Sequence, residues 1–101
     1  RAFSPDVKTE LIDLDTVKNK DIQIRNWTSG DKFQPLGMDG TKKVSDYLID
    51  MKIDRLSKEK QLVMTANDEI VWLLGQRISN KFRITNNTSN MLELSMCKQI
   101  K

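Results

Sequence analysis

The chain has 101 residues, of which 38% are hydrophobic and 31% charged, with a net charge of +3. This length suits one domain with a modest core, and no apolar run approaches the roughly 20 residues of a membrane span. Histidine is absent, and the single cysteine, Cys97, can form neither an internal disulfide nor a zinc site. The composition therefore excludes a membrane-spanning, disulfide-stapled or zinc protein. It predicts a reducing, cytoplasmic compartment and permits a nucleic-acid partner without requiring one.

The first half of the chain predicts strands and a loop. Residues 1–10 contain few side chains that could anchor them to a core and are predicted to be a connecting segment. Residues 11–101 are predicted to form the domain. Residues 10–15 and 22–27 alternate apolar and polar side chains, as half-buried strands do. Three of the four glycines then cluster around Pro35, which predicts an ordered loop with special backbone angles; they are Gly30, Gly37 and Gly40.

An amphipathic helix is predicted directly after this loop. Its apolar face follows the i, i+3, i+4, i+7 spacing, with Val44, Tyr47, Leu48 and Met51. With Thr41 as N-cap, Lys42 and Lys43 fall in the first turn, where they oppose the helix dipole by a few tenths of a kcal/mol. Free amides, a positive helix end and two ammonium groups together suit a phosphate. The lysine pair therefore predicts an anion site.

The remaining elements are short. Ser57 caps a second helical turn at residues 57–61, and a hairpin joins 62–65 to 70–74, the latter strand buried on both faces with Trp72 in the core. Residues 81–85 and 91–97 form another strand pair around a polar turn. The pattern indicates a single small α+β domain of mostly antiparallel strands with one main helix.

No catalytic apparatus is visible in the sequence. Asp46 and Asp50 stand at i, i+4 and could form an acid/base or Mg²⁺ pair, but neither a nucleophile nor a base accompanies them. They follow Lys42 and Lys43 at spacings that allow intrahelical ion pairs instead. The sequence predicts no catalytic residue, no metal ligand and no cofactor within this chain.

Basic residues gather in one window. Taken together with the helix start they favour phosphate contact over isolated solvated charges, although interleaved acids indicate local, shape-dependent recognition. The window holds Arg25, Lys32, Lys42, Lys43, Lys52 and Arg55.

Two segments, GDKFQPLGMDGTKKVSDYLIDMKIDR and IVWLLGQRISNKFRIT, carry a family resemblance. Together they resemble the C-terminal domain of bacterial tRNA(Ile)-lysidine synthase. Its pattern of glycines, paired lysines and a K-I-x-R segment is matched by Gly30, Asp31, Phe33, Pro35, Gly37, Gly40, Lys42, Lys43, Asp46, Lys52, Ile53 and Arg55. A later W-x-x-G-x-R-I strand is matched by Trp72, Gly75, Arg77 and Ile78. Asp54 stands where the family pattern has proline, so the local turn and the direction of the Arg55 side chain are left open.

The resemblance implies a three-layer α+β core that contains a β-sandwich, similar to a module of the phenylalanyl-tRNA synthetase beta chain. It also implies a domain that binds tRNA(Ile) near the acceptor stem and does not catalyse. The parent would be an ATP-dependent ligase that uses ATP, Mg²⁺ and lysine in an N-terminal catalytic domain to convert the wobble cytidine to lysidine. A homodimer of the parent is left open. The implied tRNA contacts are Lys42, Lys43, Arg25, Arg55, Arg77, Lys52 and Lys32.

Two alternatives remain at this point. Arg77 fits equally well as a structural residue bonded to strand carbonyls. The whole module could instead dock against the catalytic domain or another protein without touching RNA.

Overall fold

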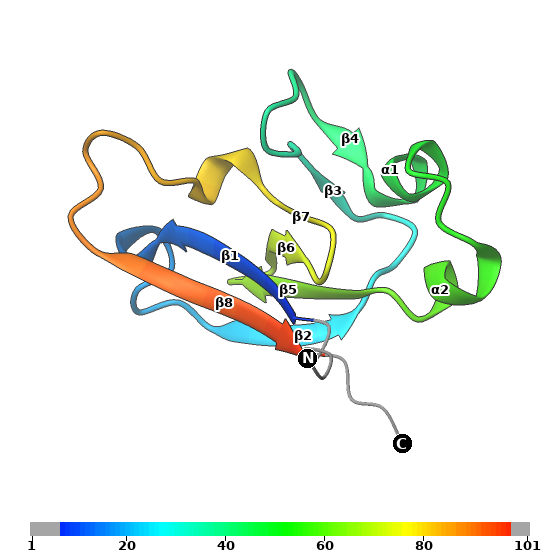
Figure 1. The fold of residues 1–101 in the computed structure, drawn as a ribbon, viewed down its shortest axis with the longest axis horizontal. Helices are drawn as coiled ribbons and strands as arrows, with labels where there is room; N and C mark the ends of the chain where they lie inside the picture. The colour runs from blue at the N-terminus through cyan, green and yellow to red at the C-terminus, as the bar shows by residue number, and fades with distance from the viewer. Residues whose placement is uncertain (1–6, 98–101) are drawn as a thin grey trace, which may run out of the picture.

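The computed structural model describes residues 7–97 of the chain, and it has mostly antiparallel strands (Figure 1). The strands are β1 (Val7–Asp13), β2 (Ile22–Asn26), β3 (Lys32–Phe33), β4 (Lys42–Lys43), β5 (Leu62–Ala66), β6 (Glu69–Leu73), β7 (Arg77–Ile78) and β8 (Met91–Cys97). Two α-helices, α1 (Val44–Asp50) and α2 (Arg55–Glu59), and two 3₁₀ turns, η1 (Leu14–Thr16) and η2 (Asn80–Phe82), complete the fold.

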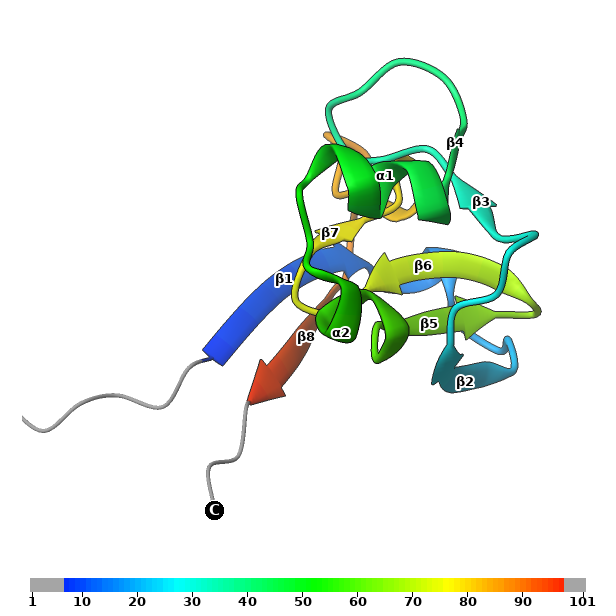
Figure 2. The same ribbon diagram turned by 90° about the vertical axis from the view of Figure 1, so that its right-hand side faces the viewer.

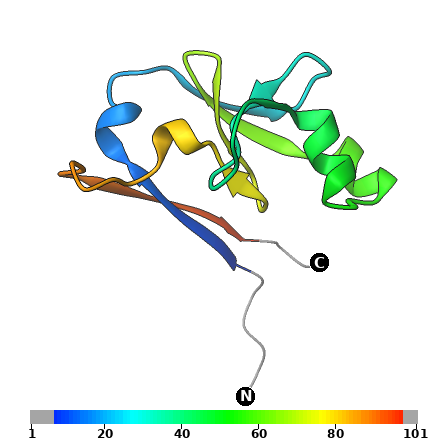
Figure 3. The same ribbon diagram turned by 90° about the horizontal axis from the view of Figure 1, so that it is seen from above.

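The elements stack in three layers. The central layer is an antiparallel sheet in the order β2-β5-β6-β7. A ribbon formed by β1 and β8 packs on one side of it, as Figure 3 shows. Helix α1 and the β3–β4 hairpin lie on the other side, above the sheet in Figure 2. The α+β class and the antiparallel character predicted from the sequence are confirmed.

The central hairpin follows the prediction closely. Strands β5 and β6 pair antiparallel, and each buries four of its five residues, in accord with a strand buried on both faces. Asn67 and Asp68 join them with φ angles of 49° and 70°, the left-handed pair that a two-residue type I′ turn requires. The Asn67 side chain also accepts a hydrogen bond from the Asp21 amide at 2.8 Å, which ties the turn to the start of β2.

Two apolar clusters hold the layers together. Between sheet and ribbon, Trp72 and Phe82 pack with Ile12 and Leu94, so the core position predicted for Trp72 is confirmed. Between sheet and α1, the helix face predicted from the periodicity is buried, with Val44, Tyr47 and Leu48 at 0–1% exposure. Met51, the fourth predicted member of that face, is 39% exposed because α1 ends at Asp50.

Trp27 also has a defined place. Its indole packs at the margin of the α1 cluster and its Nε1 donates to the Lys58 carbonyl at 2.7 Å. Trp27 thus connects the end of β2 to α2 and is not an open stacking surface.

The bounds of the first strand differ from prediction. Strand β1 starts at Val7 and pairs with β8 along its whole length, from Val7 opposite Cys97 to Asp13 opposite Met91. Residues 7–10, predicted to be a connecting segment, are therefore part of the ribbon. The strand also stops at Asp13 instead of residue 15, because the Asp13 carboxylate accepts the Asp15 amide at 3.0 Å and caps η1.

The predicted strand at residues 81–85 is wrong. Ser79 caps η2 there, and Phe82 is fully buried while Ile84 is 37% exposed. Residues 82 and 84 would share one face of a strand, so this burial pattern fits the 3₁₀ turn and not a strand. The partner of β8 is β1, which lies about eighty positions earlier in the sequence.

Gly75 allows the ribbon to approach the sheet. Its φ is +78°, and a Cβ built there would stand 3.0 Å from the Met96 Cε of β8. A side chain at this position would meet both a left-handed backbone and the ribbon. Within residues 7–97, no helix is long and apolar enough to cross a membrane.

Candidate nucleic-acid interface

The paired lysines do not lie in the first turn of the helix. Lys42 and Lys43 form strand β4, and Lys43 has an extended backbone with φ −68° and ψ 142°. Helix α1 begins at Val44, so Thr41 is not its N-cap, and both predictions were wrong. The cause is tertiary: pairing with β3 draws the two lysines into a ladder that local propensity does not reveal. The Val44 amide donates to the Asp31 carbonyl at 3.0 Å, so this first amide of the helix is already bonded within the protein.

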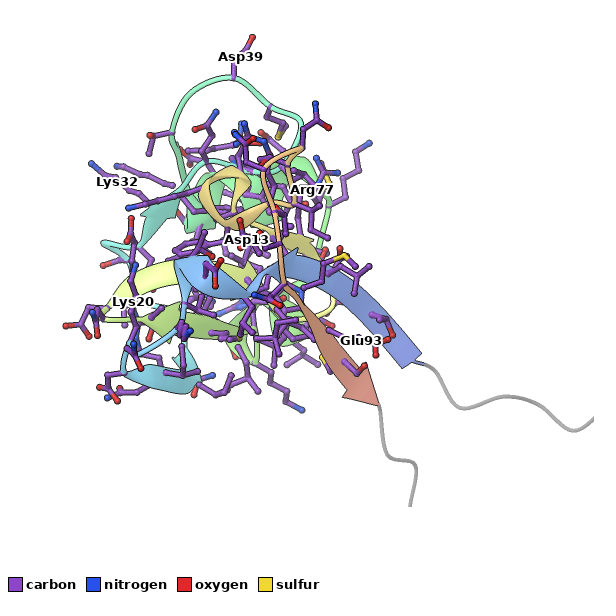
Figure 4. All side chains as sticks on the ribbon, turned by 90° about the vertical axis from the view of Figure 1, so that its left-hand side faces the viewer. Asp13, Lys20, Lys32, Asp39, Arg77 and Glu93 are labelled. Atoms are coloured by element: carbon purple, nitrogen blue, oxygen red, sulfur yellow. The ribbon has the colours of Figure 1, made fainter. Side chains whose placement is uncertain are left out.

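The same ladder brings a different pair of lysines together. Lys32 of β3 stands directly opposite Lys43 of β4, and both are exposed. Directly opposed residues have Cβ atoms about 5 Å apart, and like charges there destabilise the pair. Among the described residues, neither lysine forms an ion pair. Figure 4 shows Lys32 on the flank of the molecule, away from Glu93 of the ribbon. The arrangement offers two ammonium groups to one anion.

Lys42 points to the other face of the ladder. Its Nζ lies 2.5 Å from an Asp50 carboxylate oxygen at the far end of α1, and the pKa of Lys42 is raised by this hydrogen bond. The ion pair predicted for the helix acids therefore exists for Asp50, but it is not intrahelical, because Lys42 precedes the helix. The described residues contain no cluster of three or more potential metal ligands.

Arg25 is held by a carboxylate. Its Nη1 and Nη2 each donate to an Asp31 oxygen at 2.9 Å, and the Thr28 amide donates to the same carboxylate at 2.7 Å. The hydrogen bonds from Arg25 lower the pKa of the Asp31 carboxyl, and the same contact raises the pKa of Arg25. Arg25 thus fixes the segment between β2 and β3. The sequence prediction grouped it with the RNA contacts and missed this partner six residues away.

Replacing Asp31 with asparagine tests this contact through pH. Because folding lowers the Asp31 pKa, the charged pair stabilises the native state above about pH 4, the ordinary aspartate value. We expect Asp31→Asn to lose about 1–3 kcal/mol at pH 7, since charge-assisted hydrogen bonds disappear. The difference from wild type should shrink as the pH falls from about 4 through the lower folded pKa. Urea unfolding at several pH values measures it, and a gap that does not change with pH would contradict the assignment.

Arg77 binds a backbone carbonyl and lies over an aromatic ring. Its Nη1 donates to the Leu36 carbonyl at 3.2 Å, and its guanidinium carbon lies 5.8 Å from the Tyr47 ring centroid. The carbonyl belongs to the loop of residues 34–41 and not to a strand, so the predicted kind of partner was right and its location was wrong. Arg77 fastens this loop over α1.

The loop of residues 34–41 projects from the domain with Asp39 at its outermost point (Figure 4). Gly37 and Gly40 have φ angles of 82° and 78°, which a residue with a Cβ rarely adopts. Gln34 Nε2 donates to the Met38 carbonyl at 3.2 Å across the loop. Its shape therefore comes from two left-handed glycines and internal hydrogen bonds.

Lys52 and Arg55 lie at the opposite end of α1. Lys52 has a left-handed φ of 57° and an exposed side chain. Arg55 opens α2, and its side chain is 91% exposed, with Nε 3.7 Å from Glu59. A surface pair of this kind contributes little, so Arg55 extends into solvent.

Asp54 has a clear local role. Its carboxylate accepts the Ser57 amide at 2.9 Å and is the N-cap of α2. The prediction that Ser57 caps this helix was wrong, and the helix begins two residues earlier. Where the family pattern has proline, this chain uses an aspartate cap, which also lowers the Asp54 pKa through the Ser57 backbone hydrogen bond.

Fold and surface together define a small three-layer α+β domain that presents exposed lysines on one hairpin. The chain belongs to the family described as the TilS substrate C-terminal domain, whose model matches residues 22–95. This confirms the resemblance seen in the sequence.

Relatives agree with the family assignment. A tRNA(Ile)-lysidine synthase of Bacteroides thetaiotaomicron is 41% identical over 98 residues, which cover 91% of this chain and 23% of the relative. One of Parabacteroides distasonis is 44% identical over 71 residues, covering 70% of this chain and 16% of the relative. The chain thus spans less than a quarter of these curated relatives.

A solved structure shows the same fold. The crystal structure of a TilS C-terminal domain superimposes with a TM-score of 0.73 over 100% of this chain and 76% of that one. Sequence identity is 22%, so this similarity supports the architecture.

Proposed function

We propose that this chain is the tRNA-binding domain of a tRNA(Ile)-lysidine synthase and that it holds the tRNA for chemistry performed elsewhere. Its family is described as a substrate domain, and its relatives carry the name of the full synthase. In this proposal the parent is a cytoplasmic, ATP-dependent ligase whose N-terminal domain uses ATP, Mg²⁺ and lysine to convert the wobble cytidine of tRNA(Ile) to lysidine. The present domain contributes binding without catalysis.

The observation that carries the proposal is the cross-strand pair of Lys32 and Lys43. Both side chains are exposed, and their mutual repulsion is relieved when an anion binds between them. A-form RNA presents phosphates and 2′-hydroxyls on its surface and is recognised mainly through them. A backbone phosphate is therefore the natural occupant of this pair.

A second basic site is proposed beyond the other end of α1. Lys52 and Arg55 follow the end of α1, a helix of seven residues and therefore about 10 Å long. Two cationic groups at this separation can contact separate phosphates of one stem. Arg25, Lys42 and Arg77 already bind protein groups, so in this proposal they support the site and do not contact phosphate directly.

The experiment is a double substitution, Lys32→Ala with Lys43→Ala, titrated against an acceptor-stem minihelix of tRNA(Ile). Because the pair contacts one phosphate, its loss should reduce the magnitude of the slope of log K against log salt by about 0.9 and the affinity at 0.15 M salt by about 5-fold. The thermal midpoint should stay level or rise, since a like-charge repulsion is removed. Fluorescence anisotropy at four salt concentrations measures both quantities.

A matched control removes two other lysines. Lys18 and Lys60 are both exposed and both lie outside the β3–β4 hairpin, and replacing them with alanine gives the same net charge as the double substitution in the hairpin. This variant should retain most of the affinity. Equal losses in the two variants would show that only overall charge matters. If neither variant weakens RNA binding, while the separate catalytic domain binds tightly, the docking alternative would replace the proposal.

A further inference from the structure

We propose that Asp31 is a positioning residue for RNA binding: paired with Arg25, it holds Lys32 and Lys43 in register for a phosphate. This inference rests on the proposed function, because it needs the lysine pair to contact RNA. It assigns to a carboxylate a positive role in binding a polyanion, opposite to the effect of its charge alone.

Asp31 occupies the position that flanks the lysine pair on both strands. Along the chain it directly precedes Lys32, and its carbonyl accepts the amide of Val44, which directly follows Lys43, at 3.0 Å. Residues 31 and 44 thus continue the ladder in which Lys32 opposes Lys43. A shift of Asp31 would move both lysines at once.

Three hydrogen bonds from two residues fix the Asp31 side chain. It receives two hydrogen bonds of 2.9 Å from Arg25 and one of 2.7 Å from the Thr28 amide, and it is 11% exposed. Its own amide donates to the Thr28 carbonyl at 3.0 Å. These bonds connect the short hairpin to β2, which belongs to the central sheet.

The hairpin needs such an anchor. Each of its strands is only two residues long, and a long loop, residues 34–41, separates them. Two like charges also oppose each other in the ladder and push its strands apart. On the inner face Phe33 packs edge-to-face on Tyr47 with centroids 5.4 Å apart, and Asp31 provides the corresponding restraint at the open end.

Arg25 neutralises the charge of Asp31. A bare carboxylate beside Lys32 would repel phosphate, but the bidentate guanidinium neutralises it. Arg25 Nη1 also donates to the Asn26 carbonyl at 2.9 Å, so its fork faces the protein. We assign Arg25 to the support of the site and not to direct phosphate contact.

The test is a thermodynamic cycle in this 101-residue chain, with minihelix affinity as the readout. Simple electrostatics predicts that Asp31→Asn raises affinity, because it removes a negative charge. A positioning role predicts the reverse, a loss of about threefold to tenfold. In the Lys32→Ala/Lys43→Ala background the same substitution should change nothing, because there is no pair left to position.

Two further variants keep the result interpretable. Arg25→Lys retains the charge but not the two-pronged fork, so it should lose affinity as Asp31→Asn does; a direct phosphate contact would tolerate lysine. Asp39→Asn at the tip of the loop makes the same charge change away from the hairpin and should bind no worse than wild type.

The outcomes separate the inference from the function on which it rests. If the double lysine variant binds as wild type, the proposed phosphate site fails and the inference fails with it. If that variant is weakened while Asp31→Asn binds as well as wild type or better, only the positioning role is overturned. An equal loss from Asp31→Asn in both backgrounds also overturns it, since the effect would not pass through the lysines. Circular dichroism melts confirm that each variant is folded at the assay temperature.

Discussion

Replacing Phe82 with alanine is expected to lower the free energy of unfolding by about 3–5 kcal/mol. Phe82 is fully buried between the central sheet and the ribbon, where it packs with Trp72, Ile12 and Leu94. Small domains have only about 5–15 kcal/mol of stability, so this loss should leave the variant close to unfolding. Urea unfolding at 25 °C measures it.

The matched control is Ile84→Ala, two residues further along. In a strand the two side chains would share one face and both substitutions would be costly. In the structure Ile84 follows the 3₁₀ turn η2, lies outside the core and is 37% exposed, so its replacement should cost about 1 kcal/mol or less. Comparable losses in the two variants would favour the strand that the sequence alone suggested.

That contrast shows which parts of the fold a sequence can reveal. The β5–β6 hairpin and the buried face of α1 were predicted because their signals are local: Asn67-Asp68 favours a two-residue turn, and the apolar spacing of α1 fits one helical face. The β1–β8 ribbon was missed because its two strands lie at opposite ends of the described sequence and no local signal links them. The alternating run at residues 91–97 predicted a strand correctly but carried no information about its partner.

The candidate site follows the same rule. Adjacent lysines at positions 42 and 43 were expected to act together, yet β4 sends their side chains to opposite faces, one to Asp50 and one to solvent. Lys32 replaces Lys42 as the partner of Lys43 because two short strands pair across a loop. Successive side chains of a strand point to opposite faces, so neighbours in the sequence are separated. Strand pairing then places residues from different segments side by side. No motif in the sequence marks that register.

Arg25 gives a second example. The basic window suggested a contact for every cation, but an arginine six residues before an aspartate can also close a loop, and here it does so with two hydrogen bonds. The family pattern includes the aspartate without stating its use. The geometry supplies the reason: a carboxylate is needed beside the lysines if the hairpin is to be held in place.

The largest functional effect is expected from charge reversal, Lys32→Glu with Lys43→Glu, in a full-length synthase carrying this domain. Two carboxylates would then face the phosphate that two ammonium groups attract. The affinity for tRNA at 0.15 M salt should fall by about 100-fold or more, beyond the loss from alanine. Lysidine formation, followed over a range of tRNA concentrations, measures the change.

The kinetic constants distinguish a hairpin that only binds tRNA from one that also aligns the tRNA for reaction. If the hairpin only binds tRNA, KM for tRNA rises and kcat at saturation is unchanged, because ground state and transition state lose the same interaction. If it also sets the register of the distant cytidine, kcat falls as well, since a misplaced substrate rarely reaches the reacting geometry. Affinities for ATP and lysine should stay at wild-type values in both cases. The Lys18→Glu/Lys60→Glu control should keep a KM for tRNA and a kcat close to wild type. We expect a rise in KM for tRNA with little change in kcat, because exposed lysines on a short hairpin provide attraction, while Asp31 and Arg25 hold only these lysines in place.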